Sequence, residues 1–121
     1  MKKITIVILI FSSISVYSIP PSVTDFIKVD QFGYRLNDQK ICVISDPQTG
    51  YNSTLSFAPG NNYEVRDWNT DMTVFSGTPV AWNSGNTHAQ SGDKAWWFDF
   101  SALTTAGSYY IFDVTNNVGS G

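Results

Sequence analysis

Short hydrophobic segments of about five residues recur along the chain from Ile19 onward, separated by Gly, Asn, Asp, Pro and Ser. Segments rich in Val, Ile, Phe, Tyr and Trp and bounded by turn-forming residues are typical of β-strands. Apolar positions do not recur at helical spacing over any long window. The pattern therefore predicts an all-β fold, a β-sandwich of about seven short antiparallel strands. The predicted strands cover residues 26–32, 40–45, 54–57, 62–67, 72–76, 95–100 and 109–114.

Alternation within two of these strands predicts which side chains face the core. Successive side chains of a strand point to opposite faces, so apolar residues at every second position mark the buried face. Trp97 is two positions before Asp99 and therefore falls on the same, polar face of its strand. The predicted core-facing residues are Tyr63, Val65, Trp96, Phe98 and Phe100.

The N-terminal segment differs from the rest of the chain. Lys2 and Lys3 precede the apolar run 4–11, and small and polar residues follow at 12–18. A basic start, a short apolar stretch and a small-residue exit are typical of a secretory signal peptide, whereas a membrane span needs about 20 apolar residues. The expected organisation is a signal peptide at 1–18, a short linker at 19–25 and the sandwich at 26–121.

Irregular segments are also predicted. Residues 67–71 contain turn-forming residues between two strands and predict a hairpin turn, and residues 77–94 form the longest stretch without periodicity. The chain closes on 116–121, which we interpret as a turn leading to a final strand beyond Gly121. The sandwich is therefore expected to be incomplete at its C-terminal end, with its last strand truncated.

Composition narrows the range of partners. The formal net charge is −3, and without Lys2 and Lys3 five basic residues face ten acidic ones, which gives −5. A surface of that sign repels phosphate backbones, so no nucleic acid partner is expected, and no membrane association is expected for the mature chain. Cys42 is the only cysteine, so no internal disulfide can form. Its apolar surroundings predict a buried small side chain rather than a redox centre.

The search for catalytic chemistry finds no candidate. His88 is the only histidine and lies in the irregular segment, so we interpret it as a solvated loop residue. The acidic residues are scattered and mostly suit turns, whereas glycoside hydrolysis needs two carboxylates facing each other across a cleft. Asp67 and Asp71 alternate with other oxygen-bearing residues but lack the closing Glu of a calcium loop. No catalytic residue, metal ligand or cofactor is predicted.

Three tryptophans are candidates for binding a carbohydrate. Exposed indole rings stack on sugar rings, whose C–H faces are apolar. Each of these tryptophans could instead cover a sheet edge or contact another domain. The candidate substrate-binding residues are Trp68, Trp82 and Trp97.

Several segments, in order, resemble a known family. The chain from Ile27 to Arg35, with Asn37 to Ile44 after it, is similar to the N-terminal immunoglobulin-like domain that precedes the catalytic domain of many family 9 glycoside hydrolases. Later segments agree in order and spacing, and the resemblance spans about residues 26–115. These segments are 63–67, 74–77, and 91–96 leading into 99–101 and 104–110.

The resemblance implies an immunoglobulin-like sandwich packed beside a C-terminal (α/α)6 catalytic barrel that hydrolyses β-1,4-glucan. In such a protein this domain would be a noncatalytic partner of the barrel in a secreted cellulase, and β-glucan would be bound only through the barrel. None of the barrel's acidic residues lies within this chain. The alternative from the residues themselves is a carbohydrate-binding module that uses the exposed tryptophans.

Overall fold

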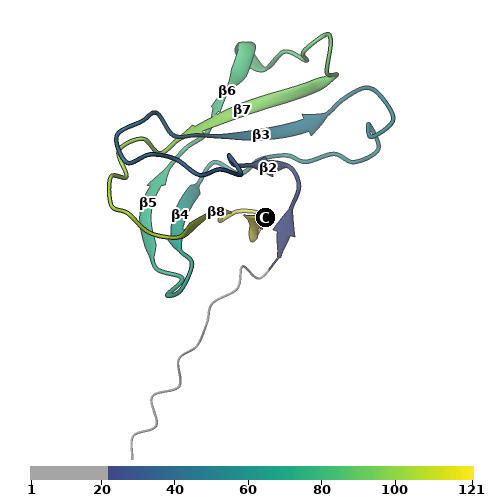
Figure 1. Cartoon of the computed structure of the whole chain (residues 1–121). Helices are drawn as coiled ribbons and strands as arrows, with labels where there is room; N and C mark the ends of the chain where they lie inside the picture. The colour runs from purple at the N-terminus through teal and green to yellow at the C-terminus, as the bar shows by residue number, and fades with distance from the viewer. Residues whose placement is uncertain (1–21) are drawn as a thin grey trace, which may run out of the picture.

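A computed structural model describes residues 22–121, and the predicted signal peptide at 1–18 lies outside them. Two β-sheets pack face to face (Figure 1). The five-stranded sheet has the order β1 (Val23–Thr24), β9 (Val118–Ser120), β8 (Tyr109–Asp113), β4 (Tyr63–Asp67) and β5 (Thr73–Gly77). The four-stranded sheet has the order β2 (Ile27–Lys28), β3 (Ile41–Pro47), β7 (Asp93–Asp99) and β6 (Val80–Ala81). The predicted all-β immunoglobulin-like sandwich is confirmed.

The core lies between the two sheets and is rich in aromatic residues. Phe98 is 1% exposed, and its ring centroid lies 5.6 Å from that of Tyr63 on the opposite sheet and 6.0 Å from that of Phe75. Cys42 pairs with Phe98 across β3 and β7 and is fully buried. Burial raises the pKa of its thiol to about 12, which keeps the sulfur protonated and unreactive at neutral pH. The predicted inward face of β7 and the burial of Cys42 are therefore confirmed.

Six of the seven predicted strands are present, with shifted ends, and the strand predicted at 54–57 is wrong. Thr54 ends a turn that begins at Gly50, and the backbone N–H of Phe57 donates to the Asp46 carboxylate at 3.0 Å instead of to a strand. Phe57 stacks on Phe26, with ring centroids 5.2 Å apart. Residues 54–57 therefore belong to a loop, which the ring and the N–H of Phe57 attach to the sandwich.

The first predicted strand, at 26–32, is shorter in the structure. Only β2 pairs with β3, because the chain turns at Asp30. The Asp30 carboxylate accepts from the N–H of Phe32 at 2.9 Å, and the Asp30 backbone carbonyl accepts from the N–H of Gly33 at 3.1 Å. Gly33 takes a φ of 81°, which favours glycine at this turn.

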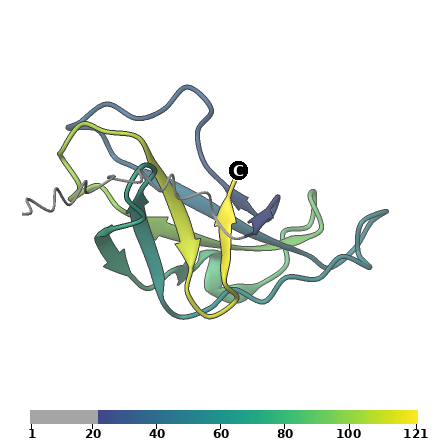
Figure 2. The same cartoon turned by 90° about the horizontal axis from the view of Figure 1, so that it is seen from below.

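Both ends of the described chain contain strands that sequence patterns did not reveal. The turn at Asn116–Asn117 leads directly into β9, so the expected strand begins within this chain at Val118 rather than beyond Gly121. Figure 2 shows β9 in yellow beside β8. The predicted strands that are present pair antiparallel with one another. β1, which was not predicted, pairs with β9 in parallel and overlaps the expected linker at 19–25.

The segment 77–94 is also more regular than expected. It contains β6, which pairs with β7, and the short 3-10 helix η1 (Trp82–Gly85). Asn83 and Ser84 adopt positive φ angles of 48° and 54° inside η1. This tight turn fixes the position of Trp82 at the edge of the four-stranded sheet.

Candidate binding surfaces

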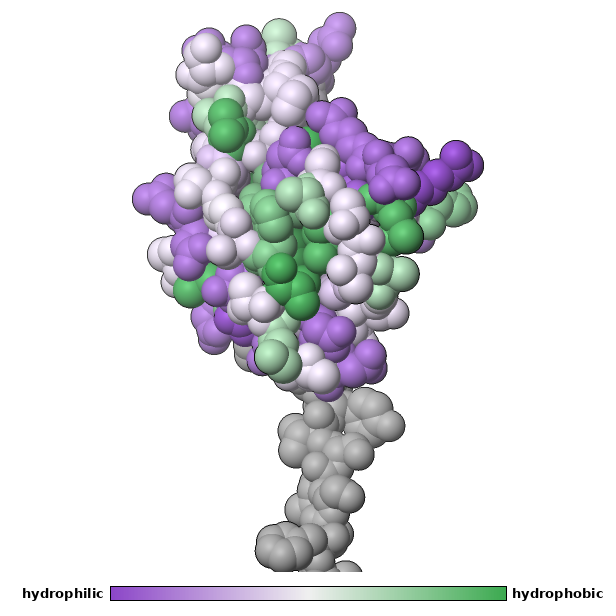
Figure 3. All heavy atoms as spheres, turned by 90° about the vertical axis from the view of Figure 1, so that its left-hand side faces the viewer, coloured by the Kyte–Doolittle hydropathy of each residue, from purple (hydrophilic) through white to green (hydrophobic). Residues whose placement is uncertain are grey.

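A cavity opens at one end of the sandwich, between the loops that follow β2 and β7. This end cleft has a volume of about 600 Å³. Its lining is mainly apolar, and Figure 3 shows apolar side chains gathered at the centre of this end of the molecule. Residues contributed by the two loops include Val29, Tyr34, Leu36, Phe100 and Leu103.

Tyr34 holds the first of these loops in place. Its hydroxyl donates to the Ile41 carbonyl at 2.8 Å and accepts from the Asp30 N–H at 3.0 Å. The ring packs edge-on against Phe100, with centroids 5.1 Å apart. Burial raises the pKa of Tyr34, so the hydroxyl keeps its donating proton at neutral pH.

Lys40 joins the two loops beneath the end cleft. The residue is 4% exposed, and its ammonium donates to the carbonyls of Leu36 at 2.6 Å, Asp38 at 3.1 Å and Ser101 at 3.3 Å. Three carbonyl acceptors compensate for the removal of the charge from water. The base of the cleft is therefore a fixed polar network under an apolar lining.

Replacing Lys40 with Met is expected to lower the free energy of unfolding by about 2 kcal/mol, because the carbonyls of Leu36, Asp38 and Ser101 lose their charged donor. Chemical denaturation followed by tryptophan fluorescence measures the change. Lys94→Met is the matched control, since its ammonium makes no hydrogen bond within residues 22–121. Equal stabilities of the two variants would show that the carbonyl network does not stabilise the loops.

A second, shallower depression crosses the outer face of the four-stranded sheet. This sheet groove has a volume of about 330 Å³ and is lined by Lys28, Val43, Ser45, Trp82, His88, Ser91, Asp93, Ala95 and Trp97. Register explains the grouping, because Trp97 pairs with Val43 on one side and with Val80 on the other. Ala95 pairs with Ser45 one step along the same face. The small side chains of Ala95 and Ser45 thus lie on the same sheet face as Trp97 and line the groove with both indole rings.

Trp97 and Trp82 border the sheet groove in different ways. Trp97 projects from the sheet and is 48% exposed, in agreement with its predicted place on the outer face. Trp82 is half-buried and packs edge-on against His88, with ring centroids 5.3 Å apart. His88 was expected to be a solvated loop residue; it does lie in a loop, but it is half-buried against Trp82, a contact that its neighbours in the chain gave no reason to expect.

Hydrogen bonds fix the loop that carries His88. Its backbone N–H donates to the Asp93 carbonyl at 2.8 Å, and its own carbonyl accepts from Gly92 at 2.8 Å. The Ser91 N–H donates to Nδ1 of the ring at 3.2 Å, so the neutral imidazole carries its proton on Nε2. The ring therefore offers a donor on the side away from Ser91.

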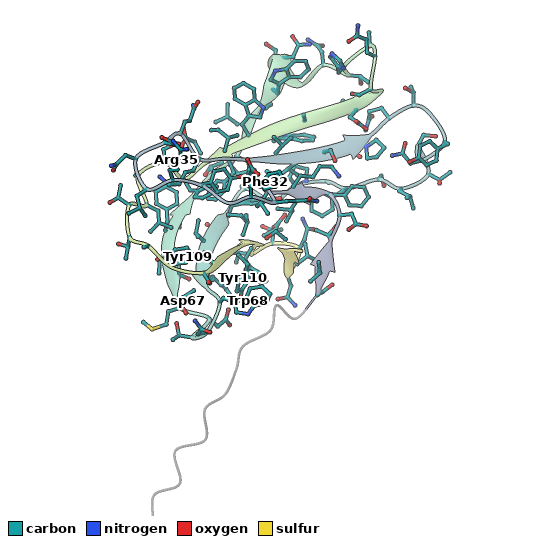
Figure 4. All side chains as sticks on the ribbon, in the orientation of Figure 1. Phe32, Arg35, Asp67, Trp68, Tyr109 and Tyr110 are labelled. Atoms are coloured by element: carbon teal, nitrogen blue, oxygen red, sulfur yellow. The ribbon has the colours of Figure 1, made fainter. Side chains whose placement is uncertain are left out.

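Trp68 lies apart from the other two candidates. It follows β4 on the five-stranded sheet, packs edge-on against Tyr110 with centroids 5.9 Å apart, and is 42% exposed. Figure 4 shows Trp68 and Tyr110 side by side. The structure therefore brings Trp82 and Trp97 to one surface and leaves Trp68 on another.

The carboxylates of the described residues serve mainly to hold turns. Asp67 accepts from the backbone N–H groups of Asn69 and Thr70, both at 2.9 Å, and these bonds lower its pKa. The predicted hairpin turn at 67–71 is confirmed. Residues 22–121 contain no cluster of three or more potential metal-ligating side chains. Within the same residues, no helix has the length and apolar character needed to cross a membrane.

Comparison with known families gives one match, which covers most of the chain. A family described as "Cellulase N-terminal ig-like domain" matches residues 22–117. No curated protein is similar enough to serve as a relative.

Solved structures with the same fold are much longer proteins. A "Bacteroides ovatus GH9" structure is similar over 78% of this chain and 14% of its own, with 25% sequence identity and a TM-score of 0.58. A metagenome-derived glycoside hydrolase family 9 endoglucanase is similar over 78% of this chain and 18% of its own, with 23% identity and a TM-score of 0.55. The chain thus spans less than a fifth of the length of either structure.

Proposed function

Because this chain belongs to the family of cellulase N-terminal Ig-like domains, we propose that it is the noncatalytic N-terminal module of a secreted glycoside hydrolase of the cellulase or endo-β-1,4-glucanase type. The observation that carries the proposal is the family match over residues 22–117, together with the small share of each solved GH9 chain that this fold occupies. The module would support the catalytic (α/α)6 domain that follows it in the same protein. The predicted signal peptide at 1–18 supports export.

The arrangement of carboxylates supports a noncatalytic role. Asp30 is the only acidic residue that lines the end cleft, and Asp93 is the only one that lines the sheet groove. Glycoside hydrolysis requires a pair of carboxyl groups about 5–9.5 Å apart on either side of the scissile bond. Neither the end cleft nor the sheet groove offers such a pair.

The end cleft is the surface best suited to contact a catalytic domain. Phe32, at the tip of the loop after β2, is 101% exposed, and the neighbouring Leu36 is also exposed. Figure 4 shows Phe32 and Arg35 on this loop, with Tyr109 across the end of the sandwich. Interdomain contacts bury surfaces of this mixed apolar and polar kind. A neighbouring domain that covers this end would remove Phe32 and the apolar lining from water.

An activity assay tests the noncatalytic role. We expect the purified chain to release no reducing ends from carboxymethyl cellulose, with a purified family 9 endoglucanase as the positive control. Release that disappears in Asp30→Asn or Asp93→Asn would place a catalytic carboxylate in this chain and contradict the proposal. The coding sequence directly after the Gly121 codon gives an independent test, because a stop codon there would contradict fusion to a catalytic domain.

A further inference from the structure

We propose that the sheet groove is a binding site for a linear β-1,4-linked glucan oligosaccharide. The ligand class rests on the proposed function, whereas the site itself rests on the geometry of the four-stranded sheet. The groove has a volume of about 330 Å³, at the lower end of the range of about 300–1,000 Å³ found for small-ligand sites.

The two indole rings supply the apolar part of the site. Trp97 stands on the sheet and leaves about half of its surface to solvent, and Trp82, which directly follows β6, lines the same groove. A β-linked glucopyranose carries its hydroxyl groups equatorially, so both of its ring faces expose C–H groups that pack against an indole. Ala95 and Ser45, two small residues, line the same groove and add little bulk beside the indole rings.

Polar groups around the rings match sugar hydroxyls. Asp93 contributes a carboxylate acceptor, and His88 contributes the Nε2–H donor fixed by its bond to Ser91. The Lys28 ammonium donates to the Asp25 carbonyl at 2.8 Å, and its other N–H groups make no bond within residues 22–121. Hydrogen-bond donors and acceptors thus line the groove together with the apolar side chains. This mixture is typical of a saccharide site rather than of a dry contact between domains.

The loop that carries His88 is set in place before any ligand binds. Gln48 and Thr49 donate their N–H groups to the Gly92 carbonyl at 2.8 Å and 3.1 Å, which joins this loop to the end of β3. Gly92 has a φ of 76°, and a side chain there would collide with Thr49. The backbone that carries His88 and Asp93 is therefore held before binding, which lowers the ordering cost.

Binding of cellohexaose to the 121-residue chain tests the site. We expect saturable binding by isothermal titration calorimetry, with a change in tryptophan fluorescence, and at least a tenfold loss of affinity in Trp97→Ala. Trp68→Ala is the matched control, because it removes an indole of similar exposure from the other sheet. Trp97→Phe, which keeps an aromatic face, should retain part of the affinity. Thermal unfolding of each variant separates lost binding from lost folding.

Three results would overturn the proposal: no binding by the unchanged chain at millimolar cellohexaose, an equal loss in Trp68→Ala, or tighter binding of mannohexaose than of cellohexaose. Chromatography of the sugar after titration distinguishes this proposal from the noncatalytic role. Intact cellohexaose that does not bind would contradict only the proposed binding site in the sheet groove. Shortened products would contradict only the noncatalytic role.

Discussion

Replacing Phe98 with Ala is expected to lower the free energy of unfolding by about 3–5 kcal/mol, the largest effect of any single change considered for this chain. Phe98 is almost fully buried at the point where the two sheets meet and contacts Tyr63, Phe75 and Phe100. Truncation to Ala leaves a cavity that aromatic rings on both sheets cannot close. For a domain of this size the midpoint temperature falls by roughly 4–8 °C for each kcal/mol. Urea denaturation and differential scanning calorimetry measure both quantities.

Trp97→Ala is the control for this experiment. It removes a larger side chain from the adjacent position of β7, but from the outer face, where half of the ring already contacts water. We expect a loss of less than about 1 kcal/mol. If the two variants lost similar stability, the assignment of the inner and outer faces of β7 would be wrong.

Removing the buried carboxylate of Asp113 is expected to cost about 3 kcal/mol in Asp113→Ala. The carboxylate is fully buried and accepts from the Gly60 N–H at 2.8 Å, from the Asn116 N–H at 3.1 Å and from the Asn116 side-chain amide at 2.7 Å. Bonds to an ionised acceptor are stronger than neutral ones, and their loss leaves the Gly60 N–H buried without a partner. Equilibrium urea denaturation measures the change.

The effect of Asp113→Ala should concentrate on the turn before β9. Asn116 also donates to the Ala58 carbonyl at 2.9 Å, so the carboxylate links this turn to the loop before β4. Hydrogen exchange should show faster exchange for the Gly119 N–H, which donates to the Ser22 carbonyl at 2.7 Å. Asp99→Ala is the control, since its exposed carboxylate accepts from the Ser101 N–H at 2.9 Å outside the core. A stability loss in Asp99→Ala as large as that in Asp113→Ala would argue against the buried network.

Strand prediction from the sequence worked where alternation and length agreed with burial. The segments around β3, β4, β7 and β8 each contain at least five strand residues and pair with neighbours over most of their length. β1, β6 and β9 have two or three residues each, too few for any periodicity to show. Their pairing depends on neighbours far away in the sequence, as when Val23 meets Gly119.

The candidate sites could be predicted only in part. Trp97 was placed on the outer face by alternation, and the structure agrees. The partners of Trp97 in the sheet groove come from β2, β3, η1 and the loop before β7 as well as from β7 itself, so no spacing along the chain connects them. In the sequence Trp68 and Trp82 were equal candidates, since each is a tryptophan in a predicted irregular segment. In the structure they lie beside different sheets.

The amino-acid sequence by itself determined the all-β class, the inward face of β7, the burial of Cys42 and the resemblance to a family that the comparison then matched over residues 22–117. These properties follow from local periodicity and from the order of motifs, both of which can be determined from the sequence without knowing which strands pair. Only the tertiary structure decided that Lys40 is buried beneath a cleft, that Asp113 joins two loops, and that His88 and Asp93 meet two tryptophans. These juxtapositions arise from strand register and sheet packing, which depend on all pairings at once.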